Sequence, residues 1–148
     1  LTKLGNRYEF FERMEVEMVR SERSGSAYSL LFIDIDNFKV LNDSQGHHVG
    51  DQALVSLAEI LTQSTRRVDT VTRFGGDEFV VLLPETEGKF CNVLVSRIKA
   101  SADSAFKKHE WPISLSIGQV TEVGRRKNID EILLNADNEM YIDKKTKH

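Results

Sequence analysis

The sequence predicts an α+β fold, a two-layer sandwich in which helices flank a largely antiparallel central sheet. Apolar residues spaced for amphipathic helices alternate with short strand-like apolar runs along all 148 residues. Gly75-Gly76 joins two β-rich stretches, and such a pair is typical of a tight hairpin, which excludes an all-parallel sheet. No repeat, proline-rich tract or glycine-serine linker divides the chain, so we expect one domain over residues 1–148.

The first half of the chain is expected to form one strand and three helices. Arg7–Arg23 carries apolar residues three and four apart among charges, which predicts an amphipathic helix. Tyr28–Ile35 follows a Ser-Gly-Ser turn and is expected to be a buried strand. The same helical spacing predicts two further helices, over Asn37–Asp43 and about Asp51–Gln63.

The second half is expected to form a hairpin, a helix, a strand and a final helix. Thr70–Phe74 and Phe79–Leu83 flank the Gly-Gly turn as hairpin strands. A helix is predicted to follow Gly88. Ile113–Val120 alternates apolar and small residues, as a half-buried strand does, and Ile129–Lys145 has helical spacing.

Composition narrows the class of protein. The 20 basic and 23 acidic residues give a net charge of −3, which argues against a protein that coats nucleic acid. The longest apolar run, Leu30–Ile33, is too short to cross a bilayer. Cys91 is the single cysteine and cannot form an internal disulfide, and no secretory signal opens the sequence. We therefore expect a cytoplasmic domain.

Two acids close the first predicted strand. Asp34 and Asp36 are two residues apart, so their side chains point to the same face, where carboxylate oxygens would suit Mg²⁺. The alternative is that Asp36 or Asn37 caps the helix that follows.

A second acidic pair follows the glycine turn. Asp77 and Glu78 precede the apolar run that begins at Phe79, where charges are costly unless they are used. They would otherwise only solvate the mouth of a hairpin. Adjacent strand residues face opposite sides, so this pair shares one metal only where the backbone is irregular.

The ordered set of motifs resembles the GGDEF family of diguanylate cyclases, and the resemblance spans the chain. The family's name is its signature, which reads here Gly75-Gly76-Asp77-Glu78-Phe79. The other matching blocks are Leu1-Thr2 with Leu4, Asn6 and Arg7; Phe32 to Lys39; Asn42-Asp43; Gly46-His47; Gly50-Asp51; Ser116-Ile117-Gly118; and Ala136-Asp137 with Tyr141 and Lys144. The resemblance implies a ferredoxin-like fold similar to the palm of nucleotide cyclases.

The resemblance also implies an activity and a metal site. Members of this family condense two GTP molecules into cyclic di-GMP and release two pyrophosphates, with metal ions assisting attack by a ribose 3′-hydroxyl on the α-phosphate. It implies that Asp34, the backbone carbonyl of Ile35, Asp77 and Glu78 hold two Mg²⁺ ions, or Mn²⁺. Asp77 is expected to matter most, and Asp36 is expected to be structural.

Four more residues match family positions that bind the substrate. By resemblance, Lys39 and Lys144 contact phosphates, although each lysine alone would also suit a solvated helix face. Asn42 and Asp51 match the pair that reads guanine, since a carboxylate accepts from two donors that adenine lacks. The alternative for Asp51 is a helix N-cap.

Arg66 and Asp69 match the family's inhibitory product site. They form R-x-x-D with five residues between Asp69 and Gly75, which is the family spacing. Arg97 lies where a second arginine often joins this site. The alternative is an ion pair three residues apart in a charged helix.

The sequence departs from the family pattern at both ends. Lys3 and Gly5 replace the common glycine and proline of the opening motif, and Asn135 stands where an arginine is usual. The ragged start suggests a domain excised from a longer regulatory protein, with a fused sensor or receiver domain and a membrane anchor in the missing region.

The resemblance therefore implies a diguanylate cyclase that uses GTP as substrate and works as a homodimer. It also implies that the product, cyclic di-GMP, inhibits the enzyme. The first alternative is a catalytically silent domain that senses GTP or cyclic di-GMP. The second is a polymerase-like palm on a nucleic-acid template, and the lack of a basic stripe counts against it.

Overall fold

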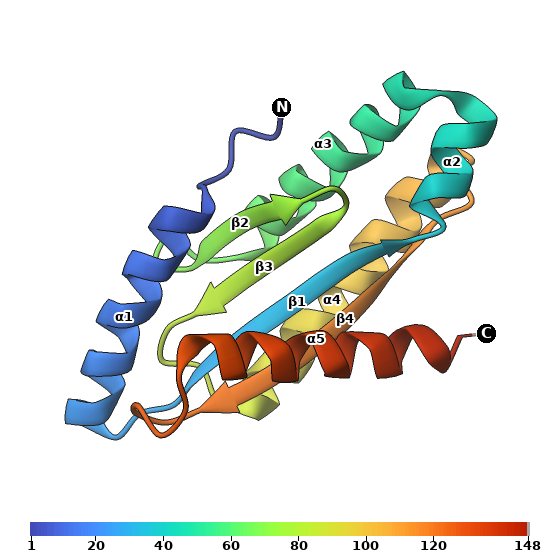
Figure 1. The fold of residues 1–148 in the computed structure, drawn as a ribbon. Helices are drawn as coiled ribbons and strands as arrows, with labels where there is room; N and C mark the ends of the chain where they lie inside the picture. Colours follow the sequence, from blue (N-terminus) through green and yellow to red (C-terminus); the bar gives the residue numbers. More distant parts are fainter. Residues whose placement is uncertain (148) are drawn as a thin grey trace.

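A computed structural model describes residues 1–147 and shows five helices around a four-stranded sheet (Figure 1). In chain order the elements are α1 (Arg7–Ser24), β1 (Tyr28–Asp36), α2 (Phe38–Gln45), α3 (His47–Ser64), β2 (Thr70–Gly75), β3 (Glu78–Leu83), α4 (Gly88–Lys108), β4 (Ser114–Glu122) and α5 (Ile129–Lys145).

The strands lie in the order β2-β3-β1-β4, and every neighbouring pair is antiparallel. The hairpin strands β2 and β3 are joined as predicted, and β1 is inserted between β3 and β4. Asp34 on β1 is therefore flanked by Glu78 of β3 on one side and by Ser116 of β4 on the other. The α+β class and the antiparallel sheet are confirmed.

Helices cover both faces of the sheet, so the structure has three layers where the sequence predicted two. One core cluster joins side chains of the sheet to α2, α3 and α4, and a second joins the opposite face to α1 and α5. All nine residues of β1 are buried. A strand buried on both sides needs cover on both sides, which explains the third layer.

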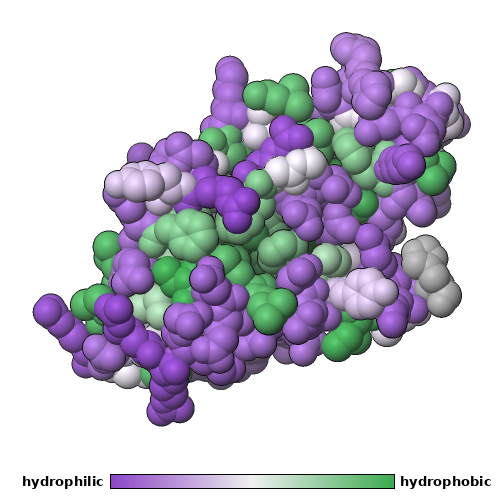
Figure 2. All heavy atoms as spheres, in the orientation of Figure 1, coloured by the Kyte–Doolittle hydropathy of each residue, from purple (hydrophilic) through white to green (hydrophobic). Residues whose placement is uncertain are grey.

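Figure 2 shows one face of the molecule, where hydrophobic residues are visible in the middle and polar residues line the edges. The partly buried hydrophobic residues that pack against the α1–α5 cluster are Phe11, Phe74, Val120, Ile129 and Leu133. Within residues 1–147, no helix combines the length and the apolar character needed to cross a membrane.

Neither helix-capping alternative from the sequence is correct. Asn37 occupies the N-cap position of α2, but its φ of 64° is left-handed and its side chain makes no capping hydrogen bond. Asp36 is buried and bonded elsewhere. Helix α3 begins at His47, four residues earlier than the sequence indicated, so Asp51 lies in its second turn. A position inside the helix removes the capping role proposed for Asp51.

Candidate active site

Asp34 of β1 lies near two consecutive carboxylates, Asp77 and Glu78, where β1 and β3 run side by side, and these three form a carboxylate cluster. Asp34 pairs in register with Glu78, the first residue of β3, and Asp77 lies in the turn just before it. Burial, followed by a hydrogen bond with Asp34 and the negative charge of Asp34, raises the pKa of Asp77 to about 7. The two aspartates therefore lie close together in a crowded negative site.

The backbone irregularity that a shared site needs is present in the hairpin. The β2–β3 register shifts between Arg73 and Gly75, which marks a bulge. Gly75 and Gly76 have φ values of 149° and 49°, in the region that favours glycine. Arg73 donates from Nη2 and Nε to the Gly76 carbonyl oxygen at 2.7 and 3.0 Å. These contacts fix the turn that carries Asp77.

Two residues near Glu78, Asp137 and Arg7, had no role assigned from the sequence. Burial raises the pKa of Glu78, and the charges of Asp34 and Asp137 add to this effect. The charges of Arg7 and Lys144 act in the opposite direction. The Arg7 guanidinium also stacks over the Phe74 ring at 4.5 Å. In the sequence, only the position of Arg7 and Asp137 within blocks that match the family pointed to them.

Lys144 reaches the carboxylate cluster from α5. Its Nζ donates to Asp34 Oδ2 at 2.7 Å and lies 3.9 Å from Asp36 Oδ1. The hydrogen bond to Asp34 raises the pKa of Lys144 despite the opposing effect of burial. The structure therefore brings Lys144 to the carboxylate cluster, where its ammonium group forms an ion pair with Asp34.

Asp36 is held in a separate buried network. It accepts hydrogen bonds from Ser114 Oγ at 2.7 Å, from Ser116 Oγ at 2.6 Å and from Lys147 Nζ at 3.0 Å. Burial acts to raise the pKa of Asp36, but these hydrogen bonds outweigh it and lower the pKa. The arrangement agrees with a structural role, because it ties β1 to β4 and to the residues that follow α5.

The donor set at the cluster suits a hard divalent cation. Asp34, Asp77 and Glu78 supply carboxylate oxygens, the ligands that Mg²⁺ prefers, and their mutual repulsion is what such an ion would relieve. As arranged here, no three His, Cys, Asp or Glu side chains of the described chain form a group that could hold a metal. The cation on Asp34 is Lys144, so a bound metal would replace a contact that the protein makes with itself.

Asn42 offers an unused hydrogen-bond acceptor next to α3. Its Oδ1 is buried without a partner among the described residues. A Cβ at Gly50 would lie 1.8 Å from that oxygen, so glycine leaves room for the Asn42 side chain in this position. Asp51 follows Gly50 and borders a pocket of about 590 Å³ together with His48, Gln52 and Trp111. A donor on a ligand would satisfy Asn42.

Lys39 is exposed on α2, and within residues 1–147 it forms no ion pair. Its ammonium group is free to meet an anion. The structure does not bring it into contact with the carboxylate cluster.

Arg66 and Asp69 form a second site in the turn between α3 and β2. Arg66 Nη2 donates to Asp69 Oδ1 at 2.8 Å, and the backbone N–H of Arg66 donates to Asp69 Oδ2 at 2.6 Å. They form an ion pair, but they lie in a turn and not in a helix as the alternative assumed. A pocket of about 350 Å³ opens here, and Arg97 lines it with them.

The two sites lie at opposite ends of β1. Ser29, near its start, donates from Oγ to the backbone oxygen of Thr86, which lines the second pocket. Asp34 lies five residues further along the strand, which is about 16 Å at the usual rise per residue.

Comparison with known proteins identifies the family. The family model described as the GGDEF domain of diguanylate cyclases matches residues 1–148. The chain belongs to the GGDEF family. The curated relatives of this GGDEF domain include MucR of Pseudomonas aeruginosa, a bifunctional diguanylate cyclase and cyclic di-GMP phosphodiesterase, at 39% identity over 95% of this chain and 21% of MucR. The diguanylate cyclase DgcS of Shewanella oneidensis is 33% identical over 95% of this chain and 47% of DgcS.

Solved structures agree with this assignment. The GGDEF domain of YfiN (TpbB) from Pseudomonas aeruginosa superposes with a TM-score of 0.87 at 34% identity, covering 99% of this chain and 93% of that one. The diguanylate cyclase SiaD of the same organism, solved with its activator SiaC, has a TM-score of 0.89 at 30% identity, covering 98% of this chain and 56% of that one. The GGDEF domain thus spans between a fifth and a half of MucR and DgcS.

Proposed function

We propose that this GGDEF domain condenses two GTP molecules into cyclic di-GMP and releases two pyrophosphates. The observation that supports it best is the convergence of Asp34, Asp77 and Glu78 at the β1–β3 junction. In each half-reaction the 3′-oxygen of one ribose would bond to the α-phosphorus of the other GTP. The bond from that phosphorus to pyrophosphate would break, and the hydroxyl would lose its proton.

Two Mg²⁺ ions are proposed to bind at Asp34, the backbone carbonyl of Ile35, Asp77 and Glu78, and Mn²⁺ would suit the same oxygen donors. When bound, such ions acidify the attacking hydroxyl and neutralise charge on the phosphate. Asp77 is the carboxylate on which we expect the rate to depend most, because it lies against Asp34 and next to Glu78.

Four residues are proposed to position GTP. Asn42 Oδ1 would accept a hydrogen bond from guanine, and the Asp51 carboxylate would accept from the N1–H and the 2-amino group together. Lys39 and Lys144 would pair with phosphate oxygens. Lys144 must then leave Asp34, its partner in this structure.

The reaction needs two copies of the domain. One site holds one GTP, and the two nucleotides must react with each other, so we propose a homodimer with its two sites face to face. Because MucR and DgcS are longer than this chain, we further propose a fused sensor or receiver segment that controls the pairing, with the domain itself in the cytoplasm.

The test is incubation of the protein at high concentration with GTP and Mg²⁺, followed by chromatographic analysis of the products. Formation of cyclic di-GMP and pyrophosphate is the expected result. Binding of GTP without turnover at any concentration would instead favour the alternative, a catalytically silent sensor domain.

We also propose that cyclic di-GMP binds at Arg66 and Asp69 and inhibits the enzyme. The pocket beside them contains Arg97, and guanidinium groups bind phosphates and guanine edges through paired donors. Because this pocket lies beside the start of β1 and Asp34 lies near its other end, product there would act without occupying the GTP site. Arg66→Ala should abolish tight product binding in calorimetry and leave GTP binding intact, whereas unchanged product affinity would leave only an ion pair.

A further inference from the structure

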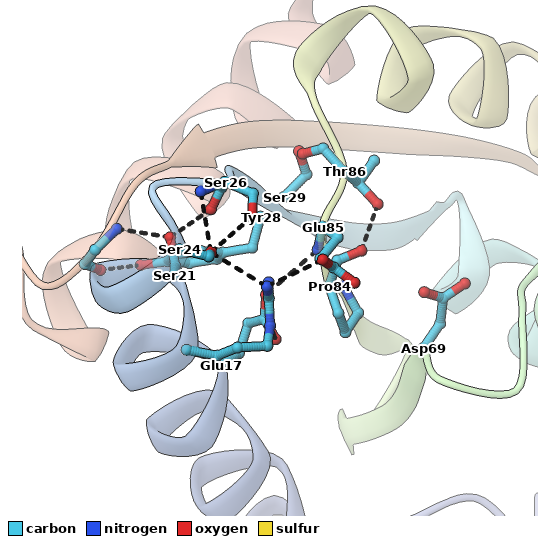
Figure 3. A network of polar contacts seen from close by, with 12 residues as sticks. Glu17, Ser21, Ser24, Ser26, Tyr28, Ser29, Asp69, Pro84, Glu85 and Thr86 are labelled. Carbon is cyan, nitrogen blue, oxygen red and sulfur yellow. Dashed lines mark hydrogen bonds and ion pairs between the residues drawn. The ribbon is translucent and has the colours of Figure 1, made fainter.

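The short loop between β3 and α4 separates helix α1 from the Arg66 pocket. Its residues Pro84, Glu85 and Thr86 lie next to Glu17 of α1 on one side and near Asp69 on the other (Figure 3). Glu85 lines the 350 Å³ pocket of Arg66 and also a neighbouring groove of about 500 Å³ along α1. Glu85 therefore forms a wall shared by the Arg66 pocket and the groove along α1.

Helix α1 holds this loop from one side. The backbone N–H of Glu85 donates to Glu17 Oε2 at 3.3 Å, and Arg20 Nη1 lies 3.2 Å from Glu85 Oε1. Arg20 also donates from Nε to Glu17 Oε1 at 2.9 Å, so the three side chains form one network. Glu17 is only 5% exposed, and burying its charge costs free energy unless ion pairs and hydrogen bonds such as these compensate for it.

The loop needs such support, because Glu85 has a left-handed backbone. Its φ is 49°, a conformation that residues other than glycine rarely adopt without surrounding contacts. The two contacts from α1 reach the backbone and the side chain of this one residue. Without them, the turn at Glu85 is expected to relax.

The other side of the loop holds Arg66. Arg66 Nη2 donates to the Pro84 carbonyl oxygen at 2.7 Å and to Thr86 Oγ1 at 2.9 Å, and Thr86 Oγ1 donates in turn to the Pro84 oxygen. The hydrogen bond to Asp69 has the largest effect on the Arg66 pKa, and the charges of Glu85 and Glu17 raise it further. The orientation of the guanidinium thus depends on the residues on either side of Glu85.

We propose that Glu17 and Arg20 are positioning residues for the Arg66 pocket, and that α1 acts through Glu85 on the orientation of the Arg66 guanidinium. A shift of α1 would then change how the pocket binds an anionic ligand that Arg66 contacts. That this ligand is cyclic di-GMP rests on the function proposed above. The coupling between α1 and Arg66 does not depend on the ligand's identity.

The coupling is tested first without ligand. In Glu17→Gln we expect the Arg66 Nε–H signal in a ¹H–¹⁵N spectrum to exchange with water about tenfold faster, since one charge-assisted contact behind the loop is lost. Arg20→Gln removes the ion pair with Glu85, while the glutamine amide can still donate to the buried Glu17, so it should act in the same direction with a smaller effect. Glu15→Gln is the matched control, because Glu15 lies on the same helix and pairs with Arg125 at 3.4 Å, away from the loop.

Thermal unfolding of each variant separates positioning from general destabilisation. The proposal is supported if Arg66 exchanges faster in Glu17→Gln and Arg20→Gln but not in Glu15→Gln, while the three variants have similar melting temperatures. Unchanged Arg66 exchange in both variants overturns it, and so does an equal change in Glu15→Gln. If Glu17→Gln is too unstable to measure, the result for Arg20→Gln decides.

Calorimetry with cyclic di-GMP then tests the consequence for binding. We expect about fivefold weaker binding in Arg20→Gln and unchanged binding in Glu15→Gln. Wild-type affinity in Arg20→Gln, or an equal loss in Glu15→Gln, would overturn the consequence for binding. If wild type does not bind cyclic di-GMP, the proposed product site fails, while the exchange measurements still decide whether α1 positions Arg66.

Discussion

Lys144 donates a hydrogen bond of 2.7 Å to Asp34, although the two residues are 110 positions apart in the sequence. The contact joins the last turns of α5 to the end of β1. Asp36 is paired in the same way with Lys147, at 3.0 Å. Lysines of this chain therefore pair with both Asp34 and Asp36, of which only Asp34 belongs to the carboxylate cluster.

Replacing Lys144 with Gln should increase metal binding by the nucleotide-free domain. The substitution frees Asp34 and removes one positive charge, so we expect the affinity for Mn²⁺ to rise about tenfold, measured by electron paramagnetic resonance of the free ion. Lys147→Gln is the control, because Lys147 pairs with Asp36, and its effect should be much smaller. Equal or weaker Mn²⁺ binding by Lys144→Gln would show that Lys144 does not compete with the metal.

Asp77→Asn should abolish catalysis and leave the fold intact. The amide keeps the shape of the side chain but loses a charged metal ligand, so we expect the rate of cyclic di-GMP formation to fall by about a thousandfold or more. GTP binding through Asn42 and Asp51 should persist. Asp103→Asn, an exposed acid on α4, is the control and should keep full activity. Near-normal turnover by Asp77→Asn would exclude Asp77 from the chemistry.

Asp51→Ser should relax the preference for GTP over ATP. Asp51 is exposed in the second turn of α3 and does not cap the helix, so the substitution should cost little stability. Binding of both nucleotides in competition gives the readout, and we expect GTP to lose about tenfold of its advantage. Gln63→Ser, exposed on the same helix and outside that pocket, is the control. An unchanged preference would mean that another group reads guanine.

Gly118→Ala should destabilise the domain strongly. A Cβ at Gly118 on β4 would lie 2.1 Å from the backbone oxygen of Ala136 and 2.2 Å from the backbone nitrogen of Met140, both on α5. Because backbone cannot move aside as a side chain can, we expect a loss of about 3 kcal/mol in urea denaturation. Gly88→Ala is the control, since the nearest atom there is 3.6 Å away. Similar midpoints for the two variants would contradict this packing.

The buried thiol of Cys91 predicts a loss of stability at high pH. Burial raises the pKa of Cys91 to about 11, whereas an unfolded thiol titrates near 8.5. Between these values the unfolded chain releases a proton that the folded chain keeps, so the free energy of unfolding falls as pH rises, by up to about 1.4 kcal/mol per unit. Urea denaturation at pH 8 and pH 10 should show a larger fall for wild type than for Cys91→Ala. Equal falls would show that the thiol titrates alike in both states.

Local patterns predicted the helices and strands well, because each depends on neighbouring residues. The predicted bounds of the last helix, Ile129–Lys145, match those observed, and both hairpin strands were found at the Gly75-Gly76 turn. The start of α3 was predicted four residues late, because the polar segment from His47 has no apolar spacing, and the chain turns at Gly46, where φ is 93°.

The sequence by itself determined the α+β class, the antiparallel hairpin and the family, because these depend on spacing and on motifs that can be read along the chain. Only the tertiary structure decided that a third layer covers the sheet, that Lys144 rests on Asp34, and that Glu17 reaches the backbone of Glu85. The last two contacts join residues 110 and 68 positions apart. Which distant side chains meet is set by how α1 and α5 pack on the sheet, and no local pattern encodes that packing.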